Sequence, residues 1–187
     1  MSNNQPFVGS GDAEAHDTAQ LPAEEGRGDA VAHHCLVLAC GNTLRGDDGV
    51  GWELARRAAD FDPQAEVITS GQWTPELAEP LSRAVAVLFL DCSTDSEPGE
   101  VRLRTIEPST VLPRLFTHHL CPADLLALSR DLYQKAPHCA LLLTVGAASL
   151  ELAEELTATV TAALPEAQLR LEEAINRCNA ERCNAER

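Results

Sequence analysis

Residues 35–57, CLVLACGNTLRGDDGVGWELARR, contain the stretch that decides the fold. The first six residues, Cys35–Cys40, are uniformly apolar, as expected for a strand that is covered on both faces of a parallel sheet. Gly41 ends this strand, and from Val50 onward apolar residues recur at helical spacing. The stretch therefore predicts a buried strand, a glycine-rich turn and an amphipathic helix.

Two adjacent carboxylates, Asp47 and Asp48, distinguish this turn from a phosphate-binding loop. A glycine-rich turn between a strand and a helix usually binds anions through its backbone N–H groups, but the two aspartates would repel a phosphate. Neither GxGxxG nor Gly-Lys-Ser/Thr occurs in the turn. One aspartate could cap the helix, which is worth ~0.5–2 kcal/mol. The other would then project over the carboxyl end of the strand, where open α/β sheets bind their ligands.

The rest of the chain alternates strand patterns with helix patterns. A continuous apolar run at 84–90 predicts a central strand, and alternating apolar and charged residues at 100–106 predict an edge strand. Further strands are predicted at 65–69 and 139–145, and helices at 74–83, 123–135 and 150–175, the last interrupted near Pro165. This order predicts an α/β fold of three layers, with a mostly parallel, twisted sheet of about five strands and helices on both faces.

The two ends of the chain lack the apolar residues that a core needs. Residues 1–30 are polar and acidic, so we expect a disordered N-terminal tail. Residues 177–187 contain the direct duplication CNAER-CNAER, and we expect a frayed C-terminal tail there. Residues 31–176 are then predicted to form a single α/β domain.

Composition narrows the possible partners and the compartment. The net charge of −15 argues against binding to nucleic acid or to an anionic membrane. No apolar run reaches the ~20 residues of a membrane span, and the N-terminus lacks the pattern of a signal peptide. Seven cysteines without a CxxC pair favour a reducing compartment, without disulfides or a structural zinc site. We therefore expect a cytoplasmic protein.

Three residues form a candidate metal site. Asp48 and Asp91 each follow a buried strand, so a parallel sheet would place both at its carboxyl edge. His118 joins them if its loop folds over that edge. Two carboxylates and one imidazole leave an open site for a divalent ion such as Ni²⁺ or Zn²⁺. Each residue also has a simpler explanation, as a helix cap, a turn residue and a surface histidine, so the hypothesis depends on the three together.

Residues 38–51, LACGNTLRGDDGVG, resemble the signature of the [NiFe]-hydrogenase maturation endopeptidases, which remove the C-terminal extension of the hydrogenase large subunit. The apolar strand that ends in Asp91, the turn Pro98-Gly99-Glu100 and the pair Thr117-His118 extend the resemblance to roughly residues 35–164. The resemblance implies an α/β fold with a five-stranded sheet and an endopeptidase of the aspartic type.

The same resemblance implies roles for particular residues. Asp48, Asp91 and His118 would bind a divalent ion and sense nickel, with Asp48 or Asp91 as the catalytic residue that activates water. Some family members have glutamate at the position of Asp48. Different branches also place the histidine at different points of the loop, so His119 is the alternative ligand.

The resemblance also implies the partner. Only a large subunit already loaded with nickel is cut in this family, so we expect no permanently bound cofactor and a Ni²⁺ ion supplied by the substrate. The expected partner is the precursor of the large subunit, with no nucleic acid, no membrane and a monomeric enzyme. Three alternatives remain: a nucleophile made of Cys92 or Cys121 with His118, a hydrolase with its own zinc, and a non-enzymatic nucleotide- or flavin-binding module of similar fold.

Overall fold

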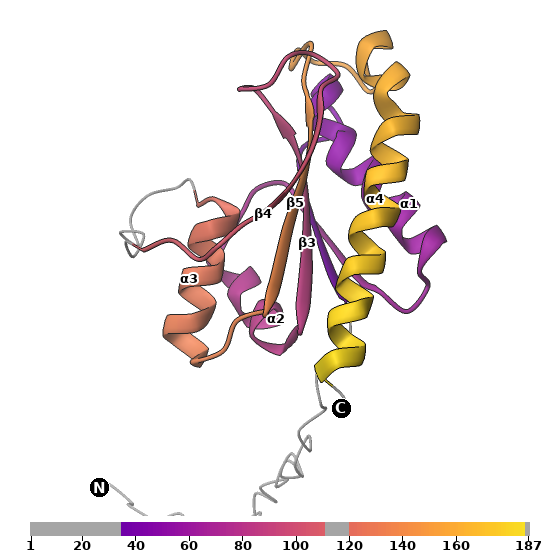
Figure 1. Ribbon diagram of the computed structural model, residues 1–187. Coiled ribbons are helices and arrows are strands. Elements are labelled where there is room, and N and C mark those ends of the chain that lie inside the picture. The colour runs from indigo at the N-terminus through magenta and orange to yellow at the C-terminus, as the bar shows by residue number, and fades with distance from the viewer. Residues whose placement is uncertain (1–34, 111–119, 186–187) are drawn as a thin grey trace, which may run out of the picture. The chain divides into compact units, whose positions relative to one another are not determined.

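The computed structural model describes residues 35–110 and 120–185 (Figure 1). The N-terminal tail predicted at 1–30 and both candidate histidines, His118 and His119, lie outside these residues.

The described residues form one five-stranded sheet with helices on both sides. The strands are β1 (Cys35–Cys40), β2 (Glu66–Ser70), β3 (Ala86–Ser93), β4 (Val101–Thr105) and β5 (Cys139–Gly146). The helices are α1 (Val50–Phe61), α2 (Ala78–Arg83), α3 (Pro122–Tyr133) and α4 (Ala158–Ala185), with short 3-10 helices η1 (Gly46–Gly49) and η2 (Pro75–Leu77).

The sheet has the strand order β2-β1-β3-β5-β4. Strands β1, β2, β3 and β5 are parallel, and β4 runs antiparallel to β5 at one edge. The side chains of β4 are partly or fully exposed, as the alternating pattern at 100–106 predicts. The structure thus confirms the predicted α/β class, the mostly parallel sheet and the edge position of this strand.

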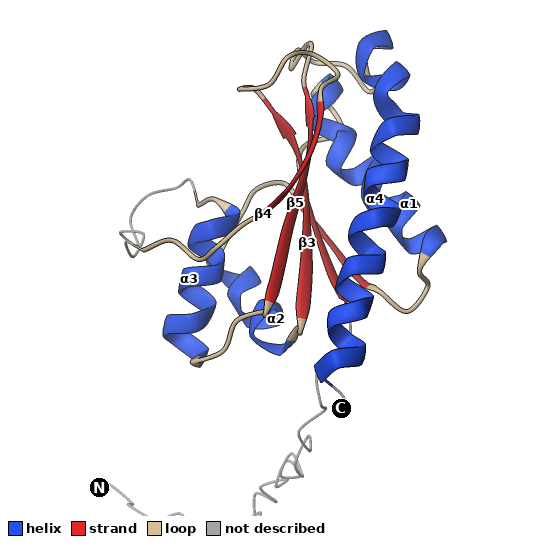
Figure 2. Cartoon of the chain, in the orientation of Figure 1, coloured by secondary structure: helices blue, strands red, loops and turns tan. Residues whose placement is uncertain are grey.

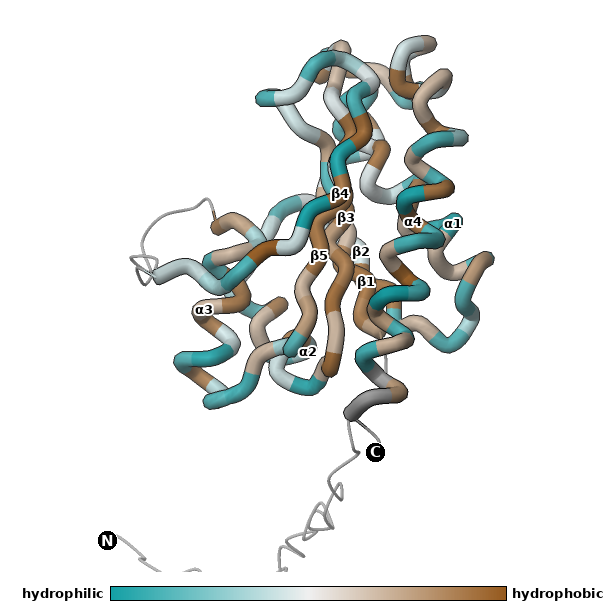
Figure 3. The backbone as a smooth tube through the Cα atoms, in the orientation of Figure 1, coloured by the Kyte–Doolittle hydropathy of each residue, from teal (hydrophilic) through white to brown (hydrophobic). Residues whose placement is uncertain are grey.

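Helices cover both faces of the sheet, so the molecule has three layers (Figure 2). Helices α1 and α4 share one hydrophobic cluster with one face of β1, β3 and β5, and α2 and α3 share a second cluster with the opposite face. In β1, Val37 belongs to the first cluster, and Leu36 and Leu38 belong to the second. Apolar residues accordingly dominate the central strands (Figure 3). Burial on both faces explains why β1 has no polar alternation in its sequence.

The last helix differs from the prediction at both of its ends. Helix α4 spans Ala158–Ala185, whereas the sequence predicted a helix over 150–175 and a frayed tail at 177–187. The helix starts later because the backbone N–H groups of Ala148, Ser149 and Thr157 are bonded to Asp47. It ends later because Cys178 is completely buried in the core formed by α1 and α4.

Pro165 lies inside α4 without ending it. A proline in a helix interior removes one backbone hydrogen bond and crowds the preceding turn. The helix continues because Leu164, Ala167 and Leu171 on its inner side pack into the core, while Pro165 itself is exposed. Tertiary packing therefore outweighs the local helix propensity here.

We expect Pro165→Ala to raise the free energy of unfolding by about 1–3 kcal/mol, because it restores a helix hydrogen bond at an exposed site. Urea unfolding followed by circular dichroism measures this change. Pro75→Ala is the matched control, because Pro75 is exposed at the first position of η2 and replaces no internal hydrogen bond there. An equal rise in the free energy of unfolding in both variants would show that the gain at Pro165 does not come from a restored helix hydrogen bond.

Candidate active site

The strand order reverses at the carboxyl ends of β1 and β3, the position where open α/β sheets have their ligand-binding crevice. From β1 the chain passes through α1 to β2, and it then returns across the sheet to β3 on the other side of β1. The loops that leave β1 and β3 therefore diverge, and ligands bind at such switch points in open α/β sheets. Asp48 lies in the loop after β1, and Asp91 lies near the end of β3.

Glycines allow the loop after β1, residues 41–49, to fold tightly against the sheet; we refer to it as the signature loop. Gly41 has a φ of 137°, and a Cβ atom there would collide with the carbonyl oxygen of Asp48. A Cβ atom on Gly51 would collide with the carbonyl oxygen of Cys40. The indole N–H of Trp52 donates a hydrogen bond of 3.0 Å to the carbonyl oxygen of Gly41. The loop is thereby fixed at both ends.

Asp48 is partly buried and points toward β3. Its Oδ2 atom accepts a 3.0 Å hydrogen bond from the backbone N–H of Asn42, and its Oδ1 atom accepts one of 3.2 Å from the thiol of Cys92. Neither η1 nor α1 has a hydrogen bond from a capping side chain at its start. The structure therefore excludes the explanation of Asp48 as a helix cap.

Asp91 is held from two directions. The indole N–H of Trp73 donates to Oδ2 at 3.1 Å, and the backbone N–H of Cys92 donates to Oδ1 at 2.8 Å. Burial raises the pKa of the Asp91 carboxyl to about 6, the charge of Asp48 acts in the same direction, and the two hydrogen bonds oppose them. Cys92 contacts both carboxylates, so the structure brings Asp48 and Asp91 together in one crevice.

Asp47 has a different role from the helix cap that the sequence suggested. It is completely buried, and its carboxylate accepts hydrogen bonds from the backbone N–H groups of Ala148, Ser149 and Thr157 at 2.8, 3.0 and 2.7 Å. The Thr157 hydroxyl adds a fourth at 3.0 Å. Burial by itself would raise the pKa of Asp47, but these donors lower it overall. Asp47 thus anchors the signature loop to the segment between β5 and α4.

The two candidate cysteine nucleophiles lie in unfavourable surroundings. Burial and the hydrogen bond to Asp48 raise the pKa of the Cys92 thiol. Burial and the neighbouring Asp124 raise the pKa of the Cys121 thiol, which sits at the start of α3. Because the thiolate is the nucleophilic form, these surroundings argue against a cysteine mechanism.

The predicted three-ligand metal site is described only in part. Among residues 35–110 and 120–185, no group of three or more His, Cys, Asp or Glu side chains is arranged to hold a metal ion. Asp48 and Asp91 supply two of the three predicted ligands, and His118 and its alternative His119 lie outside the described residues. The participation of a histidine therefore stays a prediction.

Trp73 is a part of the site that the sequence reasoning missed. It follows β2, so the parallel sheet places it at the same carboxyl edge as Asp48 and Asp91. It is largely buried and packs edge-on against Phe89, with ring centroids 5.4 Å apart. A tryptophan directly after a strand at this edge is the signal that could have identified it.

The raised pKa of Asp91 predicts a pH-dependent effect of Asp91→Asn on stability. The folded protein holds the Asp91 proton up to about pH 6, whereas the unfolded chain releases it near 3.8. The unfolded state thus binds fewer protons between these values, and Asp91 lowers stability as pH rises through them. From pH 3.5 to pH 7.5, the stability of Asp91→Asn relative to the parent should increase by about 2 kcal/mol. Chemical denaturation at both pH values tests this, and an unchanged difference would contradict it.

The fold matches solved structures, although comparison of the sequence with protein-family models and with curated proteins gives no match. The hydrogenase maturating endopeptidase HybD from E. coli is 25% identical with a TM-score of 0.62, over 77% of this chain and 93% of that chain. An endopeptidase from Escherichia coli is 25% identical with a TM-score of 0.60, over the same shares of 77% and 93%.

A further likeness is to the [NiFe] hydrogenase maturation protease HybD from Thermococcus kodakarensis. It is 24% identical with a TM-score of 0.56, over 75% of this chain and 97% of that chain. At this identity the likeness concerns the fold. The two E. coli structures, at 25% identity, support the resemblance of the signature loop to the hydrogenase maturation endopeptidases.

Proposed function

We propose that this protein is an endopeptidase that removes the C-terminal extension from the nickel-loaded large-subunit precursor of a [NiFe] hydrogenase. The observation that carries the proposal is the convergence of Asp48 and Asp91 at the switch point of the sheet, where Cys92 contacts both. The name of the E. coli neighbour, a hydrogenase maturating endopeptidase, supports a peptidase role in hydrogenase maturation.

In the proposed mechanism the nickel ion belongs to the substrate. Asp48, Asp91 and His118 would coordinate it transiently, because an open set of two carboxylates and one imidazole suits recognition of an ion that the substrate already holds. Recognition of nickel then places the scissile peptide bond at the crevice.

Hydrolysis needs one group that moves a proton. Asp48 or Asp91 takes a proton from water as the water oxygen adds to the peptide carbonyl carbon, and the proton passes to the leaving nitrogen as the C–N bond breaks. Asp48 and Asp91 both lie at the switch point of the sheet, which supports this role for either of them. Asp47 is not suited to this role, because all four of its hydrogen bonds are directed into the protein interior.

The experiment that tests the proposal compares two forms of the precursor. Purified protein is mixed with nickel-loaded and with nickel-free large-subunit precursor, and trimming is followed by mass spectrometry. Loss of the C-terminal extension from the nickel-loaded form alone is the expected result.

Two other results would contradict the proposal. Equal trimming of both forms would contradict nickel recognition, and no trimming of either form would contradict the peptidase function. Zinc found at one equivalent in the active purified protein would favour a hydrolase with its own metal, and a retained flavin or nucleotide would favour a binding module. The paired carboxylates already disfavour an anionic nucleotide in this crevice.

A further inference from the structure

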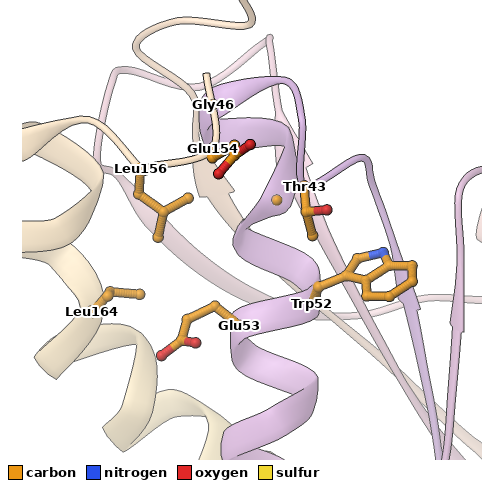
Figure 4. Close-up of a pocket in the computed structure, with 8 residues that line it drawn as sticks. Thr43, Gly46, Trp52, Glu53, Glu154, Leu156 and Leu164 are labelled. Carbon is orange, nitrogen blue, oxygen red and sulfur yellow. The ribbon is translucent and has the colours of Figure 1, made fainter. Parts of the chain in front are cut away.

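A hollow of about 310 Å³ lies beside the signature loop (Figure 4). It lies between this loop, the first turns of α1 and the segment that leads into α4. Its apolar side is formed by Leu156 and Leu164, and its carboxylates are those of Glu53 and Glu154. Thr43 and Trp52 line it further along (Figure 4). Thr43, Gly46 and Gly49 of the signature loop line the hollow, and the same loop carries Asp48.

The walls of this hollow are fixed by backbone hydrogen bonds. The N–H of Gly46 donates to the carbonyl oxygen of Ala153 at 2.8 Å, and the N–H of Ala153 donates to that of Leu44 at 3.1 Å. The side chain of Arg45 donates to the carbonyl oxygen of Leu150 at 3.3 Å. Together with the Asp47 anchor, these bonds join the signature loop to the segment 147–157 as one rigid unit, so a partner would meet a preformed surface.

Exposed leucines stand on the same rigid unit. Leu44 is 56% exposed and Leu152 is 88% exposed, and they lie on the two chain segments that pair through Ala153. Trp52, at the edge of the hollow, is 37% exposed. Exposed apolar side chains that are grouped together are a feature of protein-binding surfaces, and Leu44 and Leu152 stand on two segments that are hydrogen-bonded to each other.

The charge of this surface indicates the chemistry of the partner. Residues 146–169 include no Lys, Arg or His, and Glu151, Glu154 and Glu155 are exposed there. Glu53 is already paired with Arg56 and Arg57 at 2.9 and 2.8 Å. Glu154 has no ion-pair partner within the part of the chain that the structure describes. Arg56 and Arg57 are engaged with Glu53, and Arg45 donates to a carbonyl oxygen, so the carboxylate of Glu154 keeps its negative charge and complements a basic segment.

We propose that this hollow, together with a leucine rim formed by Leu44 and Leu152, binds the precursor. A lysine or arginine side chain of the precursor would enter the hollow. The aliphatic stem of that side chain would lie along Leu156 and Leu164, and its charge would lie beside Glu154. Apolar neighbours in the precursor would cover Leu44 and Leu152. This inference rests on the proposed function. It adds a contact that holds the precursor while Asp48, Asp91 and His118 coordinate its nickel ion.

Charge reversal at Glu154 tests the docking surface. In Glu154→Lys we expect the KM for trimming nickel-loaded precursor to rise about tenfold, with kcat and thermal stability unchanged, because the exposed residue contributes to binding alone. The parent KM should rise with salt concentration, and the variant should show a weaker dependence. Glu166→Lys is the matched control, because it makes the same charge change at an exposed position on α4 outside the hollow.

Removal of the leucine rim is the second test. Leu152→Ser should also raise KM without changing kcat, whereas Leu169→Ser, which alters an exposed leucine on α4, should not. Parent-like KM values in both Glu154→Lys and Leu152→Ser would overturn the docking surface and leave the peptidase function standing. Absence of trimming by the parent protein would overturn both.

Discussion

Asp48→Asn and Asp91→Asn should each abolish detectable trimming of the nickel-loaded precursor while the protein stays folded. Asparagine has nearly the same size as aspartate and keeps one oxygen acceptor, so each variant can retain one of the two hydrogen bonds that the aspartate accepts. What is lost is the negative charge that attracts a cation and accepts a proton from water. Substitution of a residue that only supports a metal ligand lowers metal affinity or activity about 10–100-fold. Loss of a direct ligand should lower them further.

The measurement is the initial rate of trimming by mass, with thermal unfolding recorded for each variant. A helix-cap role for Asp48 would predict normal activity and at most ~1 kcal/mol of lost stability. Normal cleavage by both variants would show that the paired carboxylates are not the site. We also expect His118→Ala to be far more harmful than His119→Ala, and the reverse result would exchange the ligand and leave the site itself intact.

Asp47→Ala should lower the free energy of unfolding by about 4 kcal/mol, a far larger effect than a helix cap would have. The substitution leaves three part-buried backbone N–H groups without their acceptor, and an unsatisfied group costs up to about 1–3 kcal/mol when it is buried. Water entering the vacated space should recover part of the sum. Urea unfolding of the parent and the variant measures the loss.

Two milder substitutions separate the contributions at Asp47. Thr157→Val removes only the hydroxyl bond and should cost about 1 kcal/mol. Asp47→Asn keeps one acceptor oxygen and should lie between Thr157→Val and Asp47→Ala. A loss below ~1 kcal/mol for Asp47→Ala would mean that the loop does not depend on this anchor.

The sequence predicted the sheet well, because strands buried on two faces leave an unmistakable pattern. Cys35–Cys40 agrees with β1 to the residue, and the runs at 84–90 and 139–145 coincide with most of β3 and β5. Helix α4 was harder to predict. Its register is set by contacts with the sheet, and both the proline inside it and the polar repeat at its end point locally to interruption.

The candidate site was predictable to the extent that it follows from sheet topology. Parallel strands end at one edge, so Asp48 and Asp91 could be placed together from their positions alone. The separate roles of the two adjacent aspartates could not be predicted. Asp48 points into the crevice and Asp47 into the interior, and the partners of Asp47 lie 101 to 110 residues further along the chain.

That long separation has a consequence for the order in which the molecule is assembled. As the chain leaves the ribosome, β1, α1 and β2 emerge first, and their local contacts can form early. The carboxylate of Asp47 cannot form its hydrogen bonds until Ala148, Ser149 and Thr157 have been synthesised, 101 to 110 residues later. Non-local contacts of this kind form slowly because the intervening chain must first be ordered. The crevice is therefore among the last parts of the protein to be completed during synthesis.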